Sequence, residues 1–329
     1  MEHEIYDVAV VGGGGAGTMS YLRAVLNNDK SILFLGDALA KKKGRALWVT
    51  DVDNIPGMHF LKKPITATTD TTLKWIESQE TLSKGKVLKH TVKKIENEGT
   101  HFRLHYEEKG VEQIVYATYV IIATGVMDVQ PQINGSIKPI FPFANRGDVL
   151  YCIRCDGHKT IGKKLTVIGN NDSAIGIGAM MNERYGHNSV DILTNGQEYS
   201  FSQKFLDLAK TYNFTFYHEP ITDILGSGKD GLKGYTFAQG EIETDMTIIS
   251  LGIIVYNDLL KQLNSELDNV GKAVVSNTFE TSVKNLFAVG DIVSGKKMQI
   301  YTGWDQAVDA ADEINRRIRM EKRSLATKT

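Results

Sequence analysis

The only two cysteines of the chain lie close together and are followed directly by an acid. Cys152 and Cys155 are separated by two residues, and Asp156 comes next. When a Cys-x-x-Cys pair opens a helix, its first thiol lies near the positive end of the helix dipole, which lowers the thiol pKa and favours the reactive thiolate. A carboxyl group beside the pair is well placed to carry protons. The spacing therefore predicts a redox-active cysteine pair with Asp156 as its acid/base.

Two other uses of such a pair compete with redox chemistry. Half of a zinc site would need further ligands, but the chain has no second cysteine pair and only His158 lies nearby in sequence. No metal site is therefore expected. The second alternative, two small buried apolar side chains, stays open. Redox chemistry is favoured because the same chain carries a dinucleotide-binding motif.

Glycines close to the N-terminus form that motif. The apolar run from Ile5 to Val11 leads into Gly12-Gly13-Gly14-Gly15-Ala16-Gly17, and a helix is expected over residues 18–26. Gly12, Gly14 and Gly17 fill the three glycine positions of G-x-G-x-x-G. The first permits a tight turn, the second lets the backbone approach a pyrophosphate, and the third lets the helix pack on the strand.

An acid follows the next strand. Residues 32–35 form this strand, and Asp37 lies near the position, about 20 residues beyond the motif, where an acid holds a ribose hydroxyl. Gly36 occupies the strand end itself, so the ribose role of Asp37 stays open.

A second strand, turn and helix repeats the pattern with two of the glycines replaced. The strand over residues 164–169 ends at Gly169, and Asn171 and Ala174 stand at the second and third glycine positions. A side chain at the middle position hinders the approach of a pyrophosphate. After the next strand, Thr194-Asn195-Gly196 contains no arginine of the kind that meets the 2′-phosphate of NADP. We therefore expect a second dinucleotide-type fold that has lost its ordinary ligand.

Strands that end in glycine mark where the predicted domains meet. Residues 119–125 form a buried strand ending in Thr124-Gly125, and residues 247–252 close the second unit in the same way. A strand that ends in Gly290-Asp291 returns the chain to the first unit. We expect an α/β protein with two Rossmann-like, three-layer dinucleotide-binding domains, the second inserted in the first. Residues 1–125 and 252–329 form one domain, and residues 126–251 form the other.

The remaining patterns predict further helices and short strands. A helix is expected over residues 71–78 and a β-meander over residues 87–95, 101–106 and 113–116. A final helix begins after Thr302, whose spacing to Asp305 is that of a capping box. Its buried face holds Ala307, Ala311, Ile314 and Ile318. Tyr301 and Trp304 at its start suit either stacking on a cofactor ring or packing in the core.

Length and composition exclude several classes of protein. With 329 residues, of which 42% are hydrophobic and 23% charged, the chain has a globular composition and room for two domains. A formal net charge of −1 gives no basic field for nucleic acid. No apolar run reaches the roughly 18 residues of a membrane span, and the start Met1-Glu2-His3-Glu4 does not resemble a signal peptide. These features predict a cytoplasmic protein that binds neither nucleic acid nor membrane, in a compartment that favours catalytic use of the cysteines.

The motifs, in their order along the chain, resemble those of the low-molecular-weight thioredoxin reductase family. They are Gly12 to Gly17, Val52-Asp53-Asn54-Ile55-Pro56-Gly57, Ala123-Thr124-Gly125, Cys152 to Gly157, Gly169 to Ala174 and Val289-Gly290-Asp291. The resemblance implies an FAD domain built from both ends of the chain, an inserted pyridine-nucleotide-type domain that carries the cysteines, and a homodimer. It also implies that Cys155 faces the flavin, that Cys152 exchanges with a thioredoxin-like dithiol protein, and that Asp156 is the acid/base.

By the same matching, several motifs contribute residues to an FAD site. These are Gly12, Gly14, Gly15, Ala16 and Gly17 of the first turn, and Asp37, Asn54, Thr124, Gly125, Gly290, Asp291, Gln299 and Ile300.

Departures from the family pattern concern NADPH. Members that use NADPH read Gly-Gly-Gly-Asp-Ser-Ala at residues 169–174 and His-Arg-Arg in place of Thr194-Asn195-Gly196, and Met298-Gln299 stands where they have Arg-Gln. Losing charge-assisted hydrogen bonds of about 1.5–3 kcal/mol each would weaken NADPH binding by orders of magnitude.

The chain therefore resembles the pyridine-nucleotide-independent branches: the ferredoxin-linked flavin thioredoxin reductases, the deeply rooted reductases and the diflavin-linked disulfide oxidoreductases. The last is favoured, because residues 45–48 and 123–131 resemble that branch and the empty second site has room for another FAD. The predicted activity is FAD-dependent disulfide exchange with a small dithiol protein, with a ferredoxin or a second flavin as the donor. An NADPH-dependent thioredoxin reductase and a non-catalytic flavin/disulfide redox sensor are the alternatives. A ferredoxin–NADP reductase of this fold would lack the cysteine pair.

Overall fold

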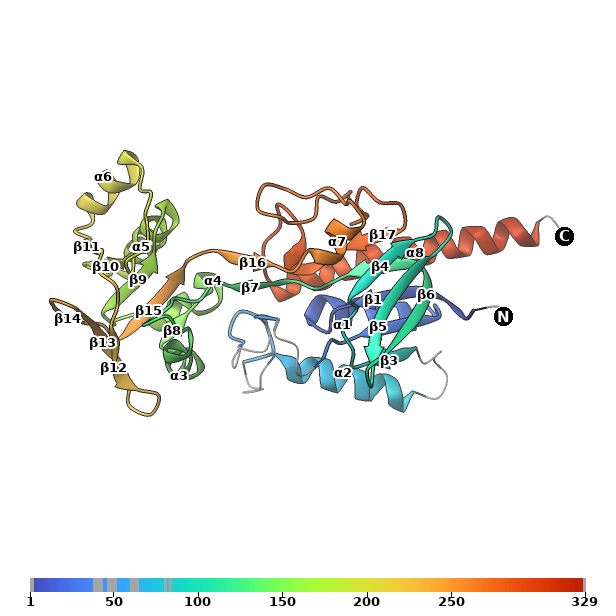
Figure 1. The fold of residues 1–329 in the computed structure, drawn as a ribbon, viewed down its shortest axis with the longest axis horizontal. Helices are drawn as coiled ribbons and strands as arrows, with labels where there is room; N and C mark the ends of the chain where they lie inside the picture. The colour runs from blue at the N-terminus through green and yellow to red at the C-terminus, as the bar shows by residue number, and fades with distance from the viewer. Residues whose placement is uncertain are drawn as a thin grey trace. The chain divides into compact units, whose positions relative to one another are not determined.

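The contacts of the chain divide it into two units (Figure 1). The structure is a computed structural model and describes residues 3–37, 44–45, 52–59, 65–79, 82 and 85–327. The first unit comprises Met1–Val49, Lys63–Met127 and Ile254–Thr329, and the second comprises Thr50–Lys62 and Asp128–Ile253. Residues 50–62 thus group with the second unit, although the predicted domain boundaries place them with the chain ends. Within this grouping, Asp53 forms ion pairs with His158 and Lys159.

A mixed sheet forms the centre of the first unit. In the described part of the chain its strands are β1 (Ile5–Val11), β2 (Ser31–Phe34), β3 (Lys86–Leu88), β4 (Lys94–Asn97), β5 (Phe102–Glu108), β6 (Val111–Ile122) and β17 (Leu286–Ala288). β3, β2, β1 and β6 lie side by side in parallel, and β17 joins β6 in parallel. β5 and β4 continue the sheet in antiparallel order. The buried parallel strands are apolar on both faces, as strands covered on both sides require.

The course of strand β6 differs from the predicted β-meander. Residues 113–116 are not a separate strand, because β6 runs unbroken from Val111 to Ile122. Its first half pairs with β5, and its second half, from Tyr116 onward, pairs with β1. The sequence pattern changes along β6 because the first half is partly exposed and the second half is buried. β3 also leaves the predicted meander and pairs with β2 instead.

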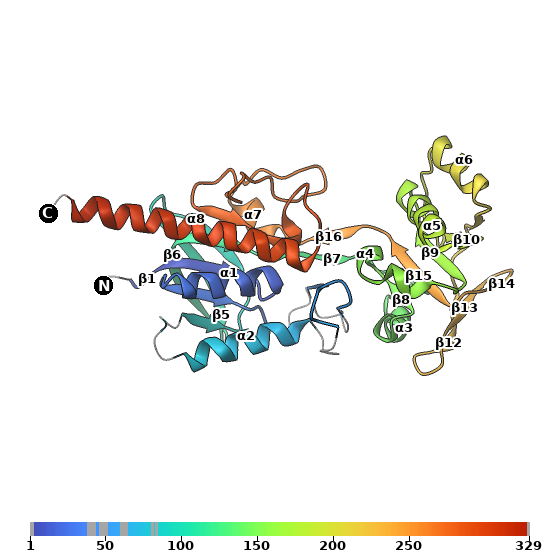
Figure 2. The ribbon, with the colours of Figure 1, turned by 180° about the vertical axis from the view of Figure 1, so that it is seen from behind.

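Helices α1 (Gly15–Leu26), α2 (Thr66–Ser78), α7 (Asp258–Gln262) and α8 (Ile300–Ala326) complete the first unit. Figure 2 shows α8 lying along α1. Arg23 on α1 donates to Asp312 on α8, with its Nε atom 2.6 Å from Oδ1. The predicted apolar face of α8 is buried. The predicted capping box is wrong, because the helix begins at Ile300 with Gln299 as its N-cap and Thr302 lies inside it.

The second unit contains a parallel sheet and a small antiparallel sheet, and a further pair of short strands contains the boundaries between the units. The parallel sheet has the order β11 (Thr215–Tyr217), β10 (Val190–Leu193), β9 (Leu165–Gly169), β15 (Met246–Ser250) and β8 (Val149–Leu150). β12 (Asp223–Ser227), β13 (Gly231–Phe237) and β14 (Gly240–Glu243) form an antiparallel sheet, and β7 (Val126–Asp128) pairs with β16 (Ile253–Val255). The described helices here are α3 (Phe141–Arg146), α4 (Ile153–Asp156), α5 (Asp172–Tyr185) and α6 (Gln203–Thr211).

Polar groups are buried in the core of each unit. Asp29 is 2% exposed, and its Oδ1 atom accepts a hydrogen bond from Asn315, whereas Oδ2 has no partner among the described residues. Burial raises the pKa of Asp29 to about 6. In the second unit, the buried hydroxyls of Tyr235 and Thr247 form a hydrogen bond of 2.8 Å.

Within the described residues, no helix combines the length and apolar character needed to cross a lipid bilayer.

Candidate active site

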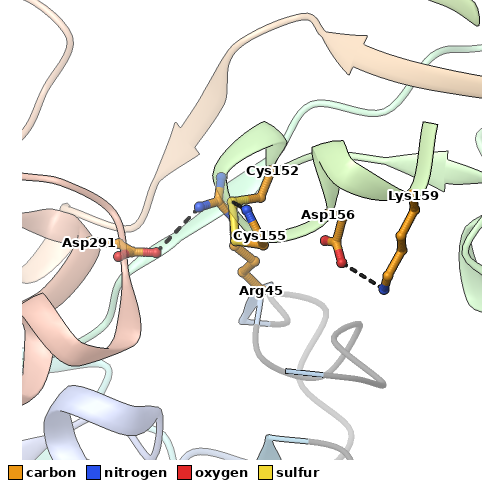
Figure 3. Close-up of a disulfide and its surroundings, with 6 residues drawn as sticks. All are labelled: Arg45, Cys152, Cys155, Asp156, Lys159 and Asp291. Carbon is orange, nitrogen blue, oxygen red and sulfur yellow. Dashed lines mark hydrogen bonds and ion pairs between the residues drawn. A yellow bond between two sulfur atoms is a disulfide. The ribbon is translucent and has the colours of Figure 1, made fainter. Parts of the chain in front are cut away.

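Cys152 and Cys155 form a disulfide at the start of α4 (Figure 3). Cys152 is the N-cap of this one-turn helix, and its Sγ atom accepts a hydrogen bond from the backbone amide of Cys155 at 3.2 Å. The two Cα atoms are 5.3 Å apart, an ordinary separation for a disulfide. The predicted pair therefore opens a helix as expected. Both residues are only partly buried, which argues against a purely apolar packing role.

Charged side chains follow the disulfide directly. The Nζ atom of Lys159 lies 2.8 Å from Oδ1 of Asp156 (Figure 3) and 3.3 Å from Oδ2 of Asp53. The Nε2 atom of His158 is 3.4 Å from the same Asp53 oxygen. Burial opposes the charge of Lys159, but the hydrogen bonds and charges of Asp156 and Asp53 outweigh it and raise the pKa of Lys159. The acid that follows the cysteines is thus held by a charged partner. Among the described residues, no cluster of three or more His, Cys, Asp or Glu side chains could bind a metal ion.

The first glycine turn joins β1 to α1 and is shaped for a phosphate group. Gly12 has a φ of +123°, and a Cβ atom there would lie 2.3 Å from the carbonyl oxygen of Ala123. A Cβ atom on Gly17 would lie 1.8 Å from the carbonyl oxygen of Gly12, whereas one on Gly14 would meet no described atom within 4 Å. Gly14 is the N-cap of α1, and no described side chain caps that helix. Open space in front of helix amides is what a dinucleotide pyrophosphate requires.

Other predicted cofactor residues of the first unit surround this turn. A Cβ atom on Gly15 would lie 2.7 Å from Cδ1 of Ile300, and one on Gly290 would lie 2.9 Å from Cβ of Ala16. The end of β6 also reaches the turn, because the Cβ position of Gly12 is 3.1 Å from the backbone nitrogen of Thr124. The predicted residues in these segments are Thr124 and Gly125, Gly290 and Asp291, and Gln299 and Ile300. FAD, which the resemblance implies, fits this group of backbone and small side chains.

Further observations concern Asp37, Asp291 and Asn54. The Oδ2 atom of Asp37 accepts a hydrogen bond from the Thr91 amide at 3.1 Å. Asp291 pairs with Arg45, with Nη1 and Oδ2 3.5 Å apart (Figure 3). Asn54 belongs to the segment that groups with the second unit. At the start of α8, Tyr301 is exposed, so it does not pack in the core, which was one of its two predicted uses.

The second glycine-like turn, between β9 and α5, is occupied by the protein's own groups. Asn171 is the N-cap of α5, and its side-chain oxygen accepts a hydrogen bond from the Ser173 amide at 3.0 Å. The loop of residues 197–202, which we call the strap, crosses this turn. Within it, the Ser200 amide donates to the carbonyl of Asn170 and the Ser202 amide donates to Asp172. The two glycine turns of the chain therefore differ: only the one in the first unit leaves open space at the N-cap position of its helix.

The residues where a 2′-phosphate would bind are engaged in the fold. Thr194 is fully buried, and the side chain of Asn195 donates to the Gln132 carbonyl and accepts from the Ile221 amide, both at 2.8 Å. Gly196 has a φ of +69°, and a Cβ atom there would lie 2.7 Å from Pro220. A residue with a side chain would fit at position 196 only if its surroundings shifted.

Two aromatic side chains of the strap, Tyr199 and Phe201, lie against Phe216 of β11 and His218, which follows that strand. The rings of Tyr199 and His218 stack with centroids 4.2 Å apart, and the rings of Phe201 and Phe216 lie 5.5 Å apart. Together with Ser200 and Leu206 these residues line an open pocket of about 470 Å³. A pocket with aromatic walls at the carboxyl edge of a parallel sheet suits a planar ring.

Comparison with solved structures identifies the fold. The crystal structure of thioredoxin reductase from Streptococcus pyogenes MGAS5005 superimposes with a TM-score of 0.82 at 21% identity, covering 97% of this chain and all of that one. The putative thioredoxin reductase of Bacillus anthracis gives 0.80 at 22% identity, covering 96% and 99%. These matches confirm the predicted α/β fold with two Rossmann-type domains. At these sequence identities the matches establish the fold alone.

The sequence comparisons identify the family. A family model described as pyridine nucleotide-disulphide oxidoreductase matches residues 6–311, so the chain belongs to that family. The thioredoxin reductase of Ureaplasma parvum serovar 3 is 26% identical over 328 residues, covering 94% of this chain and 96% of that protein. Mitochondrial thioredoxin reductase 1 of Arabidopsis thaliana is 27% identical, covering 90% and 79%. The chain is a thioredoxin reductase-like, flavin-dependent disulfide oxidoreductase, as predicted, and proteins of the thioredoxin reductase family bind FAD.

Sequence reasoning missed some of the groups around the site. Lys159 follows Asp156 by three residues, a spacing at which oppositely charged side chains meet on a helical turn, so this pair could have been found. Asp53 lies about a hundred residues earlier in the chain, and no local pattern points to its contact with Lys159. The aromatic pocket was missed because Tyr199 and His218 come from separate loops.

Proposed function

We propose that this enzyme exchanges two electrons between bound FAD, the Cys152–Cys155 disulfide and a thioredoxin-like dithiol protein, and that NADPH is not its electron donor. Relatives named thioredoxin reductase support the choice of protein substrate. One observation carries the part that concerns NADPH: Asn171 and the strap hold the turn where its pyrophosphate would bind. A homodimer, as the resemblance implies, is part of the proposal.

FAD is assigned to the domain formed by residues 1–125 and 252–329. Gly12 and Gly17 fix the turn, and the open space at Gly14 admits the pyrophosphate to the amides of α1. When bound, FAD supplies the two-electron exchange with the disulfide. The residues proposed to contact it are Gly12, Gly14, Gly15, Ala16, Gly17, Asp37, Asn54, Thr124, Gly125, Gly290, Asp291, Gln299 and Ile300.

The cysteines take different roles in the proposed exchange. The Cys152 thiolate attacks one sulfur of a partner disulfide, and the other partner sulfur leaves as a thiolate. Cys155, proposed to face the flavin, then attacks the Cys152 sulfur, which reforms the disulfide and releases the second partner thiolate. Asp156 accepts the proton that Cys155 gives up as it becomes the nucleophile. Reversal of these steps carries electrons from the partner to the enzyme.

The donor is proposed to be a ferredoxin or a second FAD. The aromatic pocket supports the second FAD, because its stacked rings offer a planar surface while Thr194, Asn195 and Gly196 offer no cation for a 2′-phosphate. The alternative is an NADPH-dependent thioredoxin reductase, which the retained strand, turn and helix of β9 and α5 favour.

The test is an anaerobic titration of the purified flavoprotein with NADPH, followed by flavin absorbance, with dithionite as the positive control. We expect no bleaching by NADPH and full bleaching by dithionite. Stoichiometric bleaching by NADPH would overturn the proposal. A count of flavins released per chain then separates the donors: two supports a second FAD, and one directs the search to ferredoxins.

The disulfide role is tested with Cys155→Ser. This variant should keep bound FAD but lose electron transfer between flavin and cysteine, because no disulfide can form. Normal turnover with a dithiol protein would exclude the assignment. A wild-type protein that binds FAD but turns over no dithiol protein would instead be a redox sensor.

A further inference from the structure

The acid beside the disulfide is part of a chain of charged groups within the second unit. The Lys159 ammonium lies between the carboxylates of Asp156 and Asp53, at 2.8 Å and 3.3 Å. Lys159 belongs to the 3₁₀ turn Gly157–Thr160, which continues directly from α4. The turn therefore fixes the spacing between Lys159 and the cysteines, and Asp53 anchors Lys159 from a distant part of the sequence.

The surroundings make this arrangement more than an ordinary surface ion pair. The side chains of Lys159, Asp156 and Asp53 are 28%, 24% and 32% exposed. A partly buried pair is screened less by solvent than an exposed one, and a short charge-assisted hydrogen bond restricts the carboxylate to one orientation. The other charged groups nearby are His158, which contacts Asp53, and Arg154 on α4.

We propose that Lys159 is a positioning residue for disulfide exchange, which holds the Asp156 carboxylate in place to accept the Cys155 proton, with Asp53 fixing Lys159 in turn. This inference rests on the proposed function. The proton passes from the Cys155 sulfur to Asp156, and Lys159 neither gains nor loses one. If Lys159 instead contacted an acidic group on the partner protein, Lys159→Met would slow exchange with that protein but not with a small uncharged disulfide.

A double-mutant cycle with a small neutral disulfide separates these roles. Reduced enzyme is mixed with bis(2-hydroxyethyl) disulfide, quenched with acid and alkylated, and the fraction of oxidised cysteine pairs is followed by mass spectrometry. The uncharged reagent removes electrostatic docking from the measured rate. The variants are Lys159→Met, Lys159→Arg, Asp156→Asn and the double variant Lys159→Met/Asp156→Asn. Lys163→Met is the matched control, because it replaces an exposed lysine that follows Lys159 closely in the sequence.

We expect Lys159→Met to slow exchange about tenfold, less than the roughly 100-fold that a misplaced catalytic group can cost. Lys159→Arg should recover most of the rate because it restores the charge. In the Asp156→Asn background, Lys159→Met should have no further effect, because Lys159 acts through Asp156. Lys163→Met should match the wild type.

Two results would overturn the inference. An unchanged rate for Lys159→Met would show that the ion pair does not contribute to disulfide exchange. Equal slowing by Lys159→Met in the wild-type and Asp156→Asn backgrounds would show that Lys159 acts independently of Asp156. Thermal melting of each variant identifies any loss that comes from unfolding, and Asp53→Asn, which leaves the turn itself intact, then provides a milder perturbation of the same pair. Failure of the proposed function is distinct, because the wild-type enzyme would then show no exchange at all.

Discussion

The glycine turn between β1 and α1 permits a matched pair of substitutions that separates folding from cofactor binding. Gly14→Ala adds a methyl group where no described atom lies within 4 Å, and the backbone there, with φ −74° and ψ −177°, accepts alanine without strain. Gly17→Ala adds the same group 1.8 Å from the Gly12 carbonyl oxygen. The chemical change is identical, but only the second collides with the protein itself.

The expected effects differ in kind. Gly14→Ala should leave the stability of the apoprotein within about 1 kcal/mol of the wild type, since alanine restricts the unfolded chain but is a poorer N-cap than glycine. It should also block the approach of the pyrophosphate and remove at least one charge-assisted hydrogen bond of about 1.5–3 kcal/mol, so FAD affinity should fall roughly 10- to 150-fold. Gly17→Ala forces α1 away from β1, and overpacking of this kind costs about 3 kcal/mol or more.

Both variants are measured as apoproteins by urea unfolding and then titrated with FAD, following the quenching of flavin fluorescence. We predict a stable Gly14→Ala apoprotein with weakened FAD binding, and a destabilised Gly17→Ala apoprotein. Wild-type FAD affinity in Gly14→Ala would refute the placement of the pyrophosphate at this turn. A loss of stability in Gly14→Ala as large as that in Gly17→Ala would refute the distinction between open and occupied space.

Further predictions concern buried polar groups and the edge of the second sheet. Asp29→Asn should raise the free energy of unfolding at pH 8 but not near pH 4. The folded pKa of about 6 exceeds the ordinary aspartate value of 3.8, so the stability contributed by the native proton is full below about pH 3.8 and is lost as the pH rises through 6. At about 1.4 kcal/mol per pKa unit the gain is at most about 3 kcal/mol, and urea unfolding that gives the same difference at both pH values would contradict the assignment. Tyr235→Phe should cost about 1–3 kcal/mol because it leaves the buried Thr247 hydroxyl unpaired, and the double variant with Thr247→Val should recover part of this loss in thermal melts. Gly196→Ala should destabilise the protein by about 1–3 kcal/mol through its positive φ and the contact with Pro220; an unchanged melting temperature would show that this turn relaxes freely.

Features that depend on neighbouring residues were predictable from the sequence. The glycine spacing of the first turn, the weakened second turn and the cysteine pair at the start of a helix each follow from residue types a few positions apart. The buried face of α8 followed from its period. Their positions in the structure agree with these expectations, while the individual cofactor and catalytic roles stay predictions.

Features that depend on distant residues were not predictable in this way. The unbroken course of β6 was hidden because half of the strand is exposed and half buried, which changes the sequence pattern along one element. The capping-box spacing at Thr302 misplaced the start of α8, since the helix already begins at Ile300, whose side chain lies beside Gly15 in the first glycine turn. Asp53, within residues 50–62, forms ion pairs with residues more than a hundred positions away.

The turn at Thr194, Asn195 and Gly196 also limits how this protein can change over evolutionary time. An arginine at 194 would place a charge in a fully buried position, one at 195 would break two hydrogen bonds, and one at 196 would collide with Pro220. Every single-step path to a phosphate-binding cation at this edge therefore passes through a less stable protein. Selection for a new nucleotide specificity would have to change the loop as a whole, so a phosphate-binding cation is difficult to introduce here by single substitutions.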